Sequence, residues 1–502
     1  MKAITIGIDF GTTNTTIAYK DGDRLETFRI DAHSRDYTPT VIAYHPRRGP
    51  EGGERAKDYV TNQNYETYEN FKLALGLSYN EAFKCSNDRD SKTPTEITKD
   101  YIGWLLRKFE GEHQKIDEII ITIPVVWYEK EDVCANIEKI FKSLGYENIE
   151  LQKEPEAAAA YFCHSYKQKH GKEFLGDILV VDYGGGTLDL THVKPKGLNE
   201  MVAYPSVFGT GNEDSLLGYA GVAFDTAATK ELLAKIDVSL KEQSPEFIQQ
   251  RIKFEKEKIS KDNVSKDMRE YLENEDENFP TDSLFEIEYN GQEIEVHPRD
   301  LAKAFRTVCK DKLETELSKM IAYLDRRGVN YNDRENFKIL LVGGFSNYIQ
   351  VELQTRAAFN SRPEDFDKKF EYPFRPSDKT YAIAKGAALA YDIKQTAQAT
   401  YGVVGYYVNE NLEVAELKTE IVKEGEEVSN FKSPRFAVPT MQIKNKDTFT
   451  IYTTKGGNEQ RETIENTFGA GDYQIGIALD KRAKTSFYVK DEEGKEQCVV
   501  RE

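Results

Sequence analysis

One short pattern occurs twice in this 502-residue chain, and it constrains the fold more than any other feature. Residues 178–191 read ILVVDYGGGTLDLT, an apolar run that leads into an acid and three glycines before apolar residues resume. Residues 4–18 read ITIGIDFGTTNTTIA. The two stretches align at four positions: Asp9 with Asp182, Phe10 with Tyr183, Gly11 with Gly184, and Asn14 with Thr187. Two strand–acid–aromatic–glycine hairpins predict two related halves.

Each copy reads as a buried strand, a tight turn and a second strand. Gly184, Gly185 and Gly186 can take positive φ and let backbone amides approach a ligand closely. Such a cradle suits phosphate, and Asp182 and Asp189 put carboxylates where a phosphate-bound Mg²⁺ needs oxygen ligands. A single copy could equally be an ordinary glycine-rich hairpin. Two copies favour a nucleotide gripped from both sides, with added hydroxyls from Thr12, Thr13 and Thr187.

Composition excludes several classes of function. The net charge is −18, and 68 Lys and Arg residues are dispersed among 86 Asp and Glu residues, so nucleic acid is a poor candidate partner. Five widely spaced cysteines without a CxxC motif support neither a disulfide framework nor a zinc site. The chain shows no signal-peptide core and no run of transmembrane length, so we expect a soluble cytoplasmic protein with no membrane partner.

The order of the remaining elements predicts an α/β domain followed by a β domain. A buried strand at 117–124 precedes a helix at 129–144, and another helix follows from residue 154. Residues 284–296 alternate on both sides of Asn290-Gly291, which predicts a type I′ hairpin. Composition changes near residue 395, and short strands with glycine-rich turns follow. We therefore divide the chain into domains 1–395 and 396–502.

Four further residues have both an ordinary and a functional interpretation. Lys72 lies beside an apolar helical pattern and could be a solvated helix lysine. Glu154 stands before a helix and could be an acid favoured by the helix dipole, or a carboxylate that orients water. Glu255 and Lys258 share a helix face at i, i+3 spacing, which more often indicates a solvated ion pair than a ligand site.

Five motifs in a fixed order resemble the nucleotide-binding domain of the seventy-kilodalton heat-shock chaperones, within the actin-fold ATPase superfamily. They are GIDFGTTNT, FKLALG, ITIP followed by EPEAAAAY, VVDYGGGTLD, and LVGGFSN followed by AKGAALAY. The match spans residues 1–395. It implies an actin-like ATPase fold of two related lobes, followed by a small all-β domain that resembles a substrate-binding β sandwich without its helical lid.

The resemblance also implies roles for individual residues. Asp9 and Asp182 would position Mg²⁺ through its water shell, Lys72 would contact the γ-phosphate, and Glu154 and Asp189 would order the attacking water. The other residues would contact ATP or ADP: Gly11, Thr12, Thr13, Asn14, Gly184, Gly185, Gly186 and Thr187 at the phosphates, Gly343 and Gly344 at the α-phosphate and ribose, Glu255 and Lys258 at the nucleoside, and Asp378 near adenine.

The resemblance implies a slowly hydrolysing, Mg²⁺-dependent ATPase with a protein or peptide client and co-chaperones. The chain departs from the family at Ile259 and Asp132, where arginines are usual, and in the linker IKQTAQATYG, which lacks an acidic, leucine-rich run. Two alternatives come from the same superfamily: an actin-like filament former, and a small-molecule kinase. The appended β domain argues against the filament, and less strongly against the kinase.

Overall fold

A computed structural model describes most of the chain, which forms two compact units. The first unit comprises residues 1–174, 178–190 and 208–391, and the second comprises 175–177, 191–207 and 392–502. The described residues are 4–22, 24–30, 37–86, 90–113, 115–128, 130–197, 199–204, 208–210, 218–260, 264–273, 282–333, 335–359, 380–408, 412–427, 433–437, 441–443, 448–465, 469–480 and 483–501.

The first sheet of the first unit carries the first hairpin. Its strands are β1 (Ile4–Phe10), β2 (Asn14–Asp21), β3 (Arg24–Thr27), β4 (Thr38–Pro39), β10 (Ile116–Ile123) and β11 (Ile149–Lys153). The strand order is β11-β10-β1-β2-β3, and β4 also pairs with β2. β1 runs parallel to β10 and antiparallel to β2, which confirms the predicted hairpin. Because Ile6 and Ile8 are fully buried, the sheet fixes the end of β1 firmly.

A second sheet carries the second hairpin. It includes β12 (Asp177–Tyr183), β13 (Leu188–Gly197), β15 (Phe208–Thr210) and β18 (Phe337–Val342). In the first unit the order is β18-β12-β13, and β15 pairs with β13. β12 is a nearly continuous apolar run with both faces buried, as expected of a central strand. β12 and β13 confirm the predicted strand–turn–strand.

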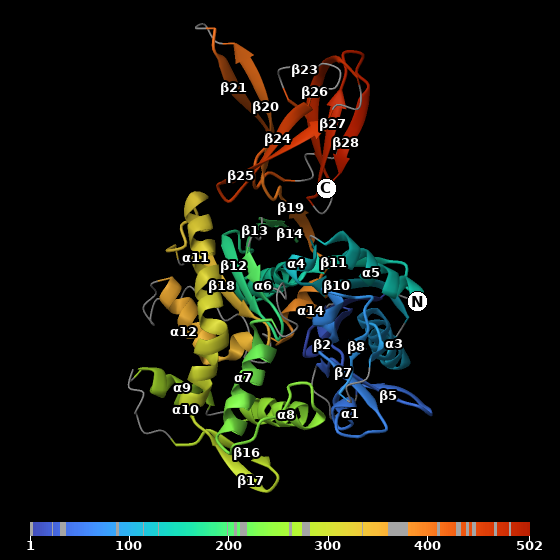
Figure 1. The fold of residues 1–502 in the computed structure, drawn as a ribbon, viewed down its shortest axis with the longest axis vertical. Coiled ribbons are helices and arrows are strands. Elements are labelled where there is room, and N and C mark those ends of the chain that lie inside the picture. The colour runs from blue at the N-terminus through green and yellow to red at the C-terminus, as the bar shows by residue number, and fades with distance from the viewer. Residues whose placement is uncertain are drawn as a thin grey trace. The chain divides into compact units, whose positions relative to one another are not determined.

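Helices surround these sheets (Figure 1). They are α1 (Glu54–Lys57), α2 (Phe71–Leu75), α3 (Pro94–Glu112), α4 (Val125–Tyr128), α5 (Glu131–Ser143), α6 (Glu154–His170), α7 (Gly221–Ala234), α8 (Pro245–Ser260), α9 (Val264–Glu273), α10 (Pro298–Phe305), α11 (Asp311–Arg326), α12 (Ile349–Ala358) and α14 (Ala382–Ala388). The predicted helix near residues 298–326 consists of α10 and α11 joined by a π turn at Arg306–Lys310. A 3₁₀ turn at Phe345–Asn347 follows β18.

Small residues let α14 pack closely on both β1 and α6. A Cβ on Gly7 of β1 would overlap the backbone of Ala384 and Ala388 in α14. A Cβ on Gly386 would overlap the backbone of Ala157 in α6. The close approach explains the small-residue composition of both helices, which the sequence pattern had indicated.

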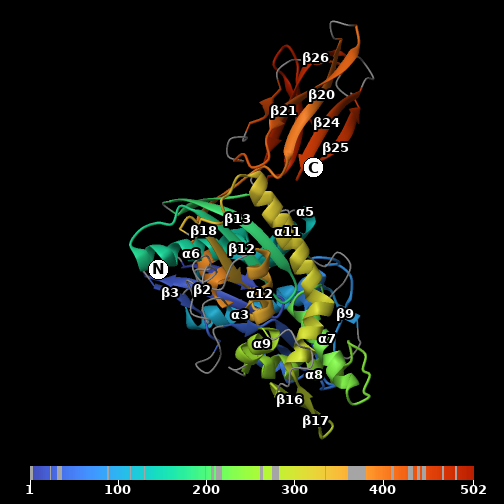
Figure 2. The same ribbon diagram turned by 90° about the vertical axis from the view of Figure 1, so that its left-hand side faces the viewer.

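Smaller sheets complete the first unit. They are formed by β5 (Val41–His45), β6 (Arg48–Gly52) and β7 (Glu66–Glu69), by β8 (Phe83–Lys84) and β9 (Asp90–Lys92), and by β16 (Phe285–Tyr289) and β17 (Gln292–Val296). The hairpin β16–β17 lies beside α8 in Figures 1 and 2. Its turn residues Asn290 and Gly291 have φ values of 51° and 80°, which confirms the predicted type I′ turn.

Two antiparallel sheets and one shared core make up most of the second unit. The strands are β20 (Thr400–Val408), β21 (Val414–Val422), β22 (Arg435–Phe436), β23 (Met441–Ile443), β24 (Thr448–Lys455), β25 (Asn458–Glu465), β26 (Gly471–Leu479), β27 (Thr485–Lys490) and β28 (Glu496–Arg501). One sheet has the order β21-β20-β24-β25, side by side in Figure 2, and the other has the order β22-β26-β27-β28. Alternate residues such as Ile475, Ile477 and Phe487 are fully buried. The architecture confirms the predicted α/β class followed by a β-rich region.

The linker segment forms a strand in the second unit. β19 (Asp392–Gln395) runs parallel to β14 (Glu200–Ala203), and the Thr396 hydroxyl donates a hydrogen bond to the Ala203 carbonyl at 2.9 Å. Backbone pairing needs no apolar side chains, so a polar linker can still dock on a strand edge. The predicted domain boundary at residue 395 remains a prediction.

Candidate functional site

The tips of the two hairpins meet at a small cavity in the first unit. Most of the predicted site residues line it together: Asp9, Gly11, Thr12, Thr13, Asn14, Lys72, Glu154, Asp182, Gly184, Gly185, Gly186, Thr187, Gly343 and Gly344. Asp189 is fully buried and does not itself line the cavity. Thr16, Thr380 and Ile383 complete the lining. Residues from six distant parts of the sequence therefore converge on one place.

The second hairpin needs glycine because the first hairpin lies so close to it. A Cβ on Gly185 would lie 2.9 Å from the Thr13 methyl group, and a Cβ on Gly186 would overlap the Leu73 side chain in α2 and lie 2.6 Å from the Thr12 hydroxyl. None of Gly184, Gly185 and Gly186 has a positive φ, so the turn does not use that conformational freedom of glycine. Glycine is needed here because a larger side chain would not fit, and not because the backbone requires a positive φ.

Hydrogen bonds fix each tip separately. In the first hairpin, the Thr40 hydroxyl donates to the Gly11 carbonyl at 2.8 Å, and the Thr40 amide donates to the Thr13 carbonyl at 2.8 Å. In the second hairpin, the Gly184 amide donates to the Thr187 carbonyl at 3.0 Å. The start of α7 adds a bond to this tip from the Val222 amide. Both tips are thus preorganised by the fold.

Lys72 and Glu154 form a buried ion pair at the cavity. The Lys72 Nζ lies 2.7 Å from Glu154 Oε1, and both side chains are almost fully buried. Lys72 also lies over the rings of Phe10 and Trp127, at 5.7 and 5.5 Å from their centroids. The interpretation of Lys72 as a solvated helix lysine is therefore wrong, and Glu154, which begins α6, has a specific partner beyond the helix dipole.

The carboxyl groups of the cavity repel one another. Burial, and then the charge of Glu154, raise the pKa of Asp9 and of Asp189 to about 7, while Lys72 opposes the rise. The pKa of Asp182 is raised well above its ordinary value, by burial and by the charges of Glu154, Asp189 and Asp9. A cation placed among these groups would relieve the repulsion.

The site suits Mg²⁺ held through water and phosphate. Within the described part of the chain, no group of three or more His, Cys, Asp or Glu side chains could hold a metal ion by itself. However, one oxygen of Asp182 and both oxygens of Asp189 are buried without a hydrogen-bond partner. Mg²⁺ usually keeps several waters and binds one or two carboxylates plus substrate phosphates. Asp9 and Asp182 match that requirement.

The short helix α4 touches the site at several points. The ring of Trp127 lies beneath Lys72 and packs against Gly76, where a Cβ would overlap it. The Val125 amide lies near the carboxylate of Asp189 and lowers its pKa slightly, although it makes no hydrogen bond of normal geometry. The residues of α4 therefore pack against Lys72 and Asp189 from behind the cavity, which the sequence pattern does not indicate.

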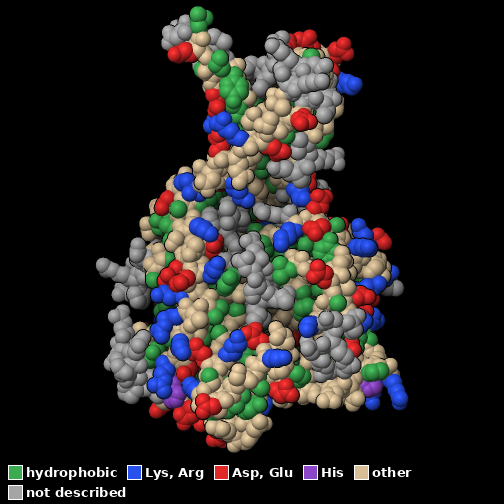
Figure 3. Space-filling view, viewed as in Figure 1, with side chains coloured by type: hydrophobic (Ala, Val, Ile, Leu, Met, Phe, Trp, Pro, Cys, Tyr) green, Lys and Arg blue, Asp and Glu red, His purple; other side chains and the backbone are tan. Residues whose placement is uncertain are grey.

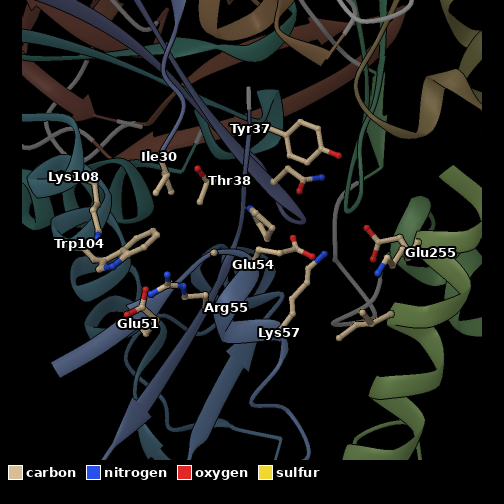
Figure 4. A pocket seen from close by; sticks show the side chains of 16 residues that line it. Ile30, Tyr37, Thr38, Glu51, Glu54, Arg55, Lys57, Trp104, Lys108 and Glu255 are labelled. Carbon is tan, nitrogen blue, oxygen red and sulfur yellow. The ribbon is translucent and has the colours of Figure 1, made fainter. Parts of the chain in front are cut away.

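Two of the predicted nucleoside contacts lie away from this cavity. Lys258 pairs with Asp225 and lies 5.0 Å over the ring of Phe224. Glu255 lines a separate cavity of about 410 Å³, and in Figure 4 it extends from α8 on the side facing Glu54 and Lys57. Asn14 lines both cavities.

Three other positions singled out in the sequence are Asp378, Ile259 and Asp132. Asp378 and the side chain of Ile259 lie outside the described residues. Asp132 is exposed on α5 and lies beside the hydroxyl of Tyr79. Of the cavity residues that sequence reasoning missed, Thr16 could have been found, because it occupies the place in the first hairpin that Asp189 occupies in the second.

Comparison with known proteins agrees with this geometry. A family model described as "Hsp70 protein" matches residues 5–475. The proteins named "Chaperone protein DnaK" of Thermotoga petrophila and Thermotoga maritima are 25% identical to this chain over 368 residues, which is 72% of this chain. The aligned region covers 56% of each of those proteins, so the chain matches about half the length of these curated relatives.

Proposed function

This chain belongs to the Hsp70 family, and from that premise we propose that it is a Mg²⁺-dependent, slowly hydrolysing ATPase of the chaperone type that binds a peptide or protein segment through its β-rich region. A single observation supports the ATPase most strongly. Two hairpin tips of related sequence face each other across one cavity, with buried acids on both and with glycines where the other tip's threonines approach.

The phosphates of ATP would lie between the two tips. Amides and hydroxyls from Thr12, Thr13 and Thr187 would bind them, and glycine lets the chain come close. The cavity, about 70 Å³, is smaller than a typical ligand pocket and suits the phosphate end of a nucleotide. Gly343 and Gly344 line it, and they would lead toward the nucleoside.

Hydrolysis would depend on positioning and charge. Lys72 would stabilise charge on the transferred phosphoryl group, and Glu154 and Asp189 would hold the attacking water. The Lys72–Glu154 distance of 2.7 Å shows that these two groups already lie together. Asp9 and Asp182 would hold Mg²⁺, which supplies charge neutralisation at the phosphates when it is bound.

The ATPase proposal is tested by phosphate release from ATP with and without Mg²⁺. We expect slow release that requires Mg²⁺ and is lost in Asp182→Asn. No release above that of the Asp182→Asn variant would contradict the proposal. Light scattering on addition of ATP and a screen for phosphorylated small molecules separate the filament former and the kinase from the ATPase.

An apolar patch on the β20–β21 hairpin supports peptide binding. Its members are exposed, large and apolar: Tyr406 (64% exposed), Leu412 (87%) and Val414 (72%). Leu417 is also exposed but pairs with Gly405, so it lies on the opposite face of the hairpin and is not part of the patch. Green side chains are visible along this hairpin in Figure 3. Exposed apolar groups gathered in one place often mark a binding surface.

Fluorescence anisotropy of a labelled apolar peptide tests the patch. Leu412→Ser with Val414→Ser should weaken binding about tenfold, since two exposed apolar contacts are lost. Leu175→Ser is the matched control, because Leu175 is also an exposed leucine of the second unit but is not in the patch. Equal affinity in the double variant and the parent would exclude the hairpin as the peptide site.

A further inference from the structure

A second buried ion pair flanks the proposed catalytic glutamate. The Nζ of Lys153 lies 3.2 Å from Glu156 Oε1, and the side chains are only 3% and 2% exposed. Glu154 lies between the two residues in sequence. Removing two charges from water costs free energy that their attraction often fails to recover, so a buried pair adds little stability by itself. Its presence beside Glu154 calls for another explanation.

Lys153 joins two elements that end at the site. It is the last residue of β11, where it pairs with Ile123 of β10, and it directly precedes α6. Its Nζ lies 4.7 Å from the centroid of the Tyr128 ring. Tyr128 is the last residue of α4. The lysine therefore bridges the first turn of α6, through Glu156, and the end of α4.

Both of these elements place groups of the proposed site. The first turn of α6 carries Glu154, which pairs with Lys72. α4 carries Trp127, which lies beneath Lys72, and Val125, whose amide lies near the Asp189 carboxylate. A shift of α4 relative to α6 would thus change the position of both carboxylates that are proposed to order water.

We propose that Lys153 and Glu156 are positioning residues that lock α4 to the first turn of α6 and so hold Glu154 and Asp189 in register. The proposal rests on the proposed ATPase function. An ion pair prefers one distance and direction, whereas an apolar contact tolerates sliding, and catalytic groups must be held to within about 0.5 Å. The ion pair thus restricts how far α4 and the first turn of α6 can move relative to each other.

The test replaces both charges together. Lys153→Met with Glu156→Leu removes both charges of the pair together, so the variant should unfold at about the same temperature as the parent or at a higher one. Turnover at saturating ATP should fall about 10- to 100-fold, as misplaced catalytic groups cause. Affinity for ADP should change less than about twofold, because the tips that bind phosphate are unaltered. Lys153→Arg, which keeps the charge, should retain most of the turnover.

A matched control removes a different ion pair. Arg356 and Glu352 on α12 lie 2.6 Å apart and are nearly buried. Arg356→Met with Glu352→Leu should leave turnover unchanged. A purely structural role for Lys153 and Glu156 predicts that their double variant behaves like this control.

A crystal structure of the double variant separates this proposal from the proposed function. We expect the 2.7 Å contact between Lys72 Nζ and Glu154 Oε1 to open beyond hydrogen-bond distance, about 3.5 Å. Unchanged turnover in a folded variant, or an intact contact, overturns the positioning role. If the parent itself releases no phosphate from ATP, the proposed function fails, and the Lys72–Glu154 distance alone then decides the positioning role.

Discussion

The two hairpin tips share a sequence pattern but contribute differently to the site. Asp9 faces Thr16 across the first hairpin, whereas the second hairpin has Asp189 at the place that corresponds to Thr16. Asp182 is therefore surrounded by more negative charge than Asp9: besides burial, the charges of Glu154, Asp189 and Asp9 raise the pKa of Asp182, whereas the charge of Glu154 alone adds to burial at Asp9. The repeated pattern provides two similar tips, and a single difference between them places an additional buried acid, Asp189, on one side only.

The glycines of the two tips also differ. A Cβ on Gly11 would overlap the Asn14 carbonyl, so this glycine is needed by its own turn. A Cβ on Gly184 would lie 3.9 Å from the Thr187 carbonyl, an ordinary contact, whereas one on Gly185 would overlap the first hairpin's Thr13. Glycine thus serves the turn in one copy and the meeting of the copies in the other.

Replacement of Asp9 or Asp182 should cause the largest loss of turnover. Asp182→Asn and Asp9→Asn should each lower Mg²⁺-dependent turnover by about 100-fold or more, since each removes an anionic group that holds the metal. The loss should be greater for Asp182, which lies nearer Asp189. Steady-state phosphate release over a range of Mg²⁺ concentrations measures this. A larger loss in Asp9→Asn would reverse the comparison, and parental turnover in both variants would remove the mechanism.

Lys72 lies close to both tips, and its replacement should cause the second-largest loss of turnover. Lys72→Ala should lower the turnover number about 10- to 100-fold and the affinity for ATP much less, because its charge is needed most as phosphoryl transfer develops. Single-turnover kinetics and titration with a fluorescent nucleotide separate the two quantities. If affinity falls and the turnover number does not, Lys72 only binds the nucleotide.

The stability of the protein without nucleotide and Mg²⁺ should depend on pH. The pKa of Asp9 is about 7 in the folded protein and 3.8 as its ordinary value, so the folded state binds more protons between these limits. The free energy of unfolding should therefore fall, on the order of a few kcal/mol, as pH rises from about 4 through 7.

Thermal melts across this pH range check the expected slope. Asp9→Asn and Asp182→Asn should each flatten it. A stability that rises with pH in this window, or an unchanged slope in both variants, would show that the carboxyl groups are not crowded as described.

The smallest expected effect is a change in stability on replacing glycines of the second tip. Gly185→Ala should destabilise the fold by about 1–3 kcal/mol, because the added methyl group overpacks the contact with Thr13. Gly184→Ala should stay within about 0.5 kcal/mol of the parent. Urea unfolding measures both variants. Equal losses would mean that the tips do not meet as closely as described.

Local features of the fold could be predicted from the sequence because they depend on neighbours in the chain. The Asn290-Gly291 turn follows from local chemistry, and the two hairpins follow from an apolar run that ends in an acid and glycine. The convergence of Asp9 and Asp182 could be inferred because the pattern repeats.

The rest of the site depends on tertiary contacts. The proximity of the hairpin tips, which explains Gly185 and Gly186, leaves no periodic signal in the chain. The same holds for the burial of Lys153, because lysine before a helix is ordinarily exposed. Spacing alone likewise did not reveal that Glu255 lines a separate cavity.

The most direct test of the account is a crystal structure with Mg²⁺ and a non-hydrolysable ATP analogue. The account predicts phosphates between Thr12 and Thr13 on one side and the amides of residues 184–187 on the other, with Mg²⁺ linked through water to Asp9 and Asp182. A nucleotide bound elsewhere, for example in the 410 Å³ cavity beside Glu255 with no contact to either hairpin tip, would contradict it.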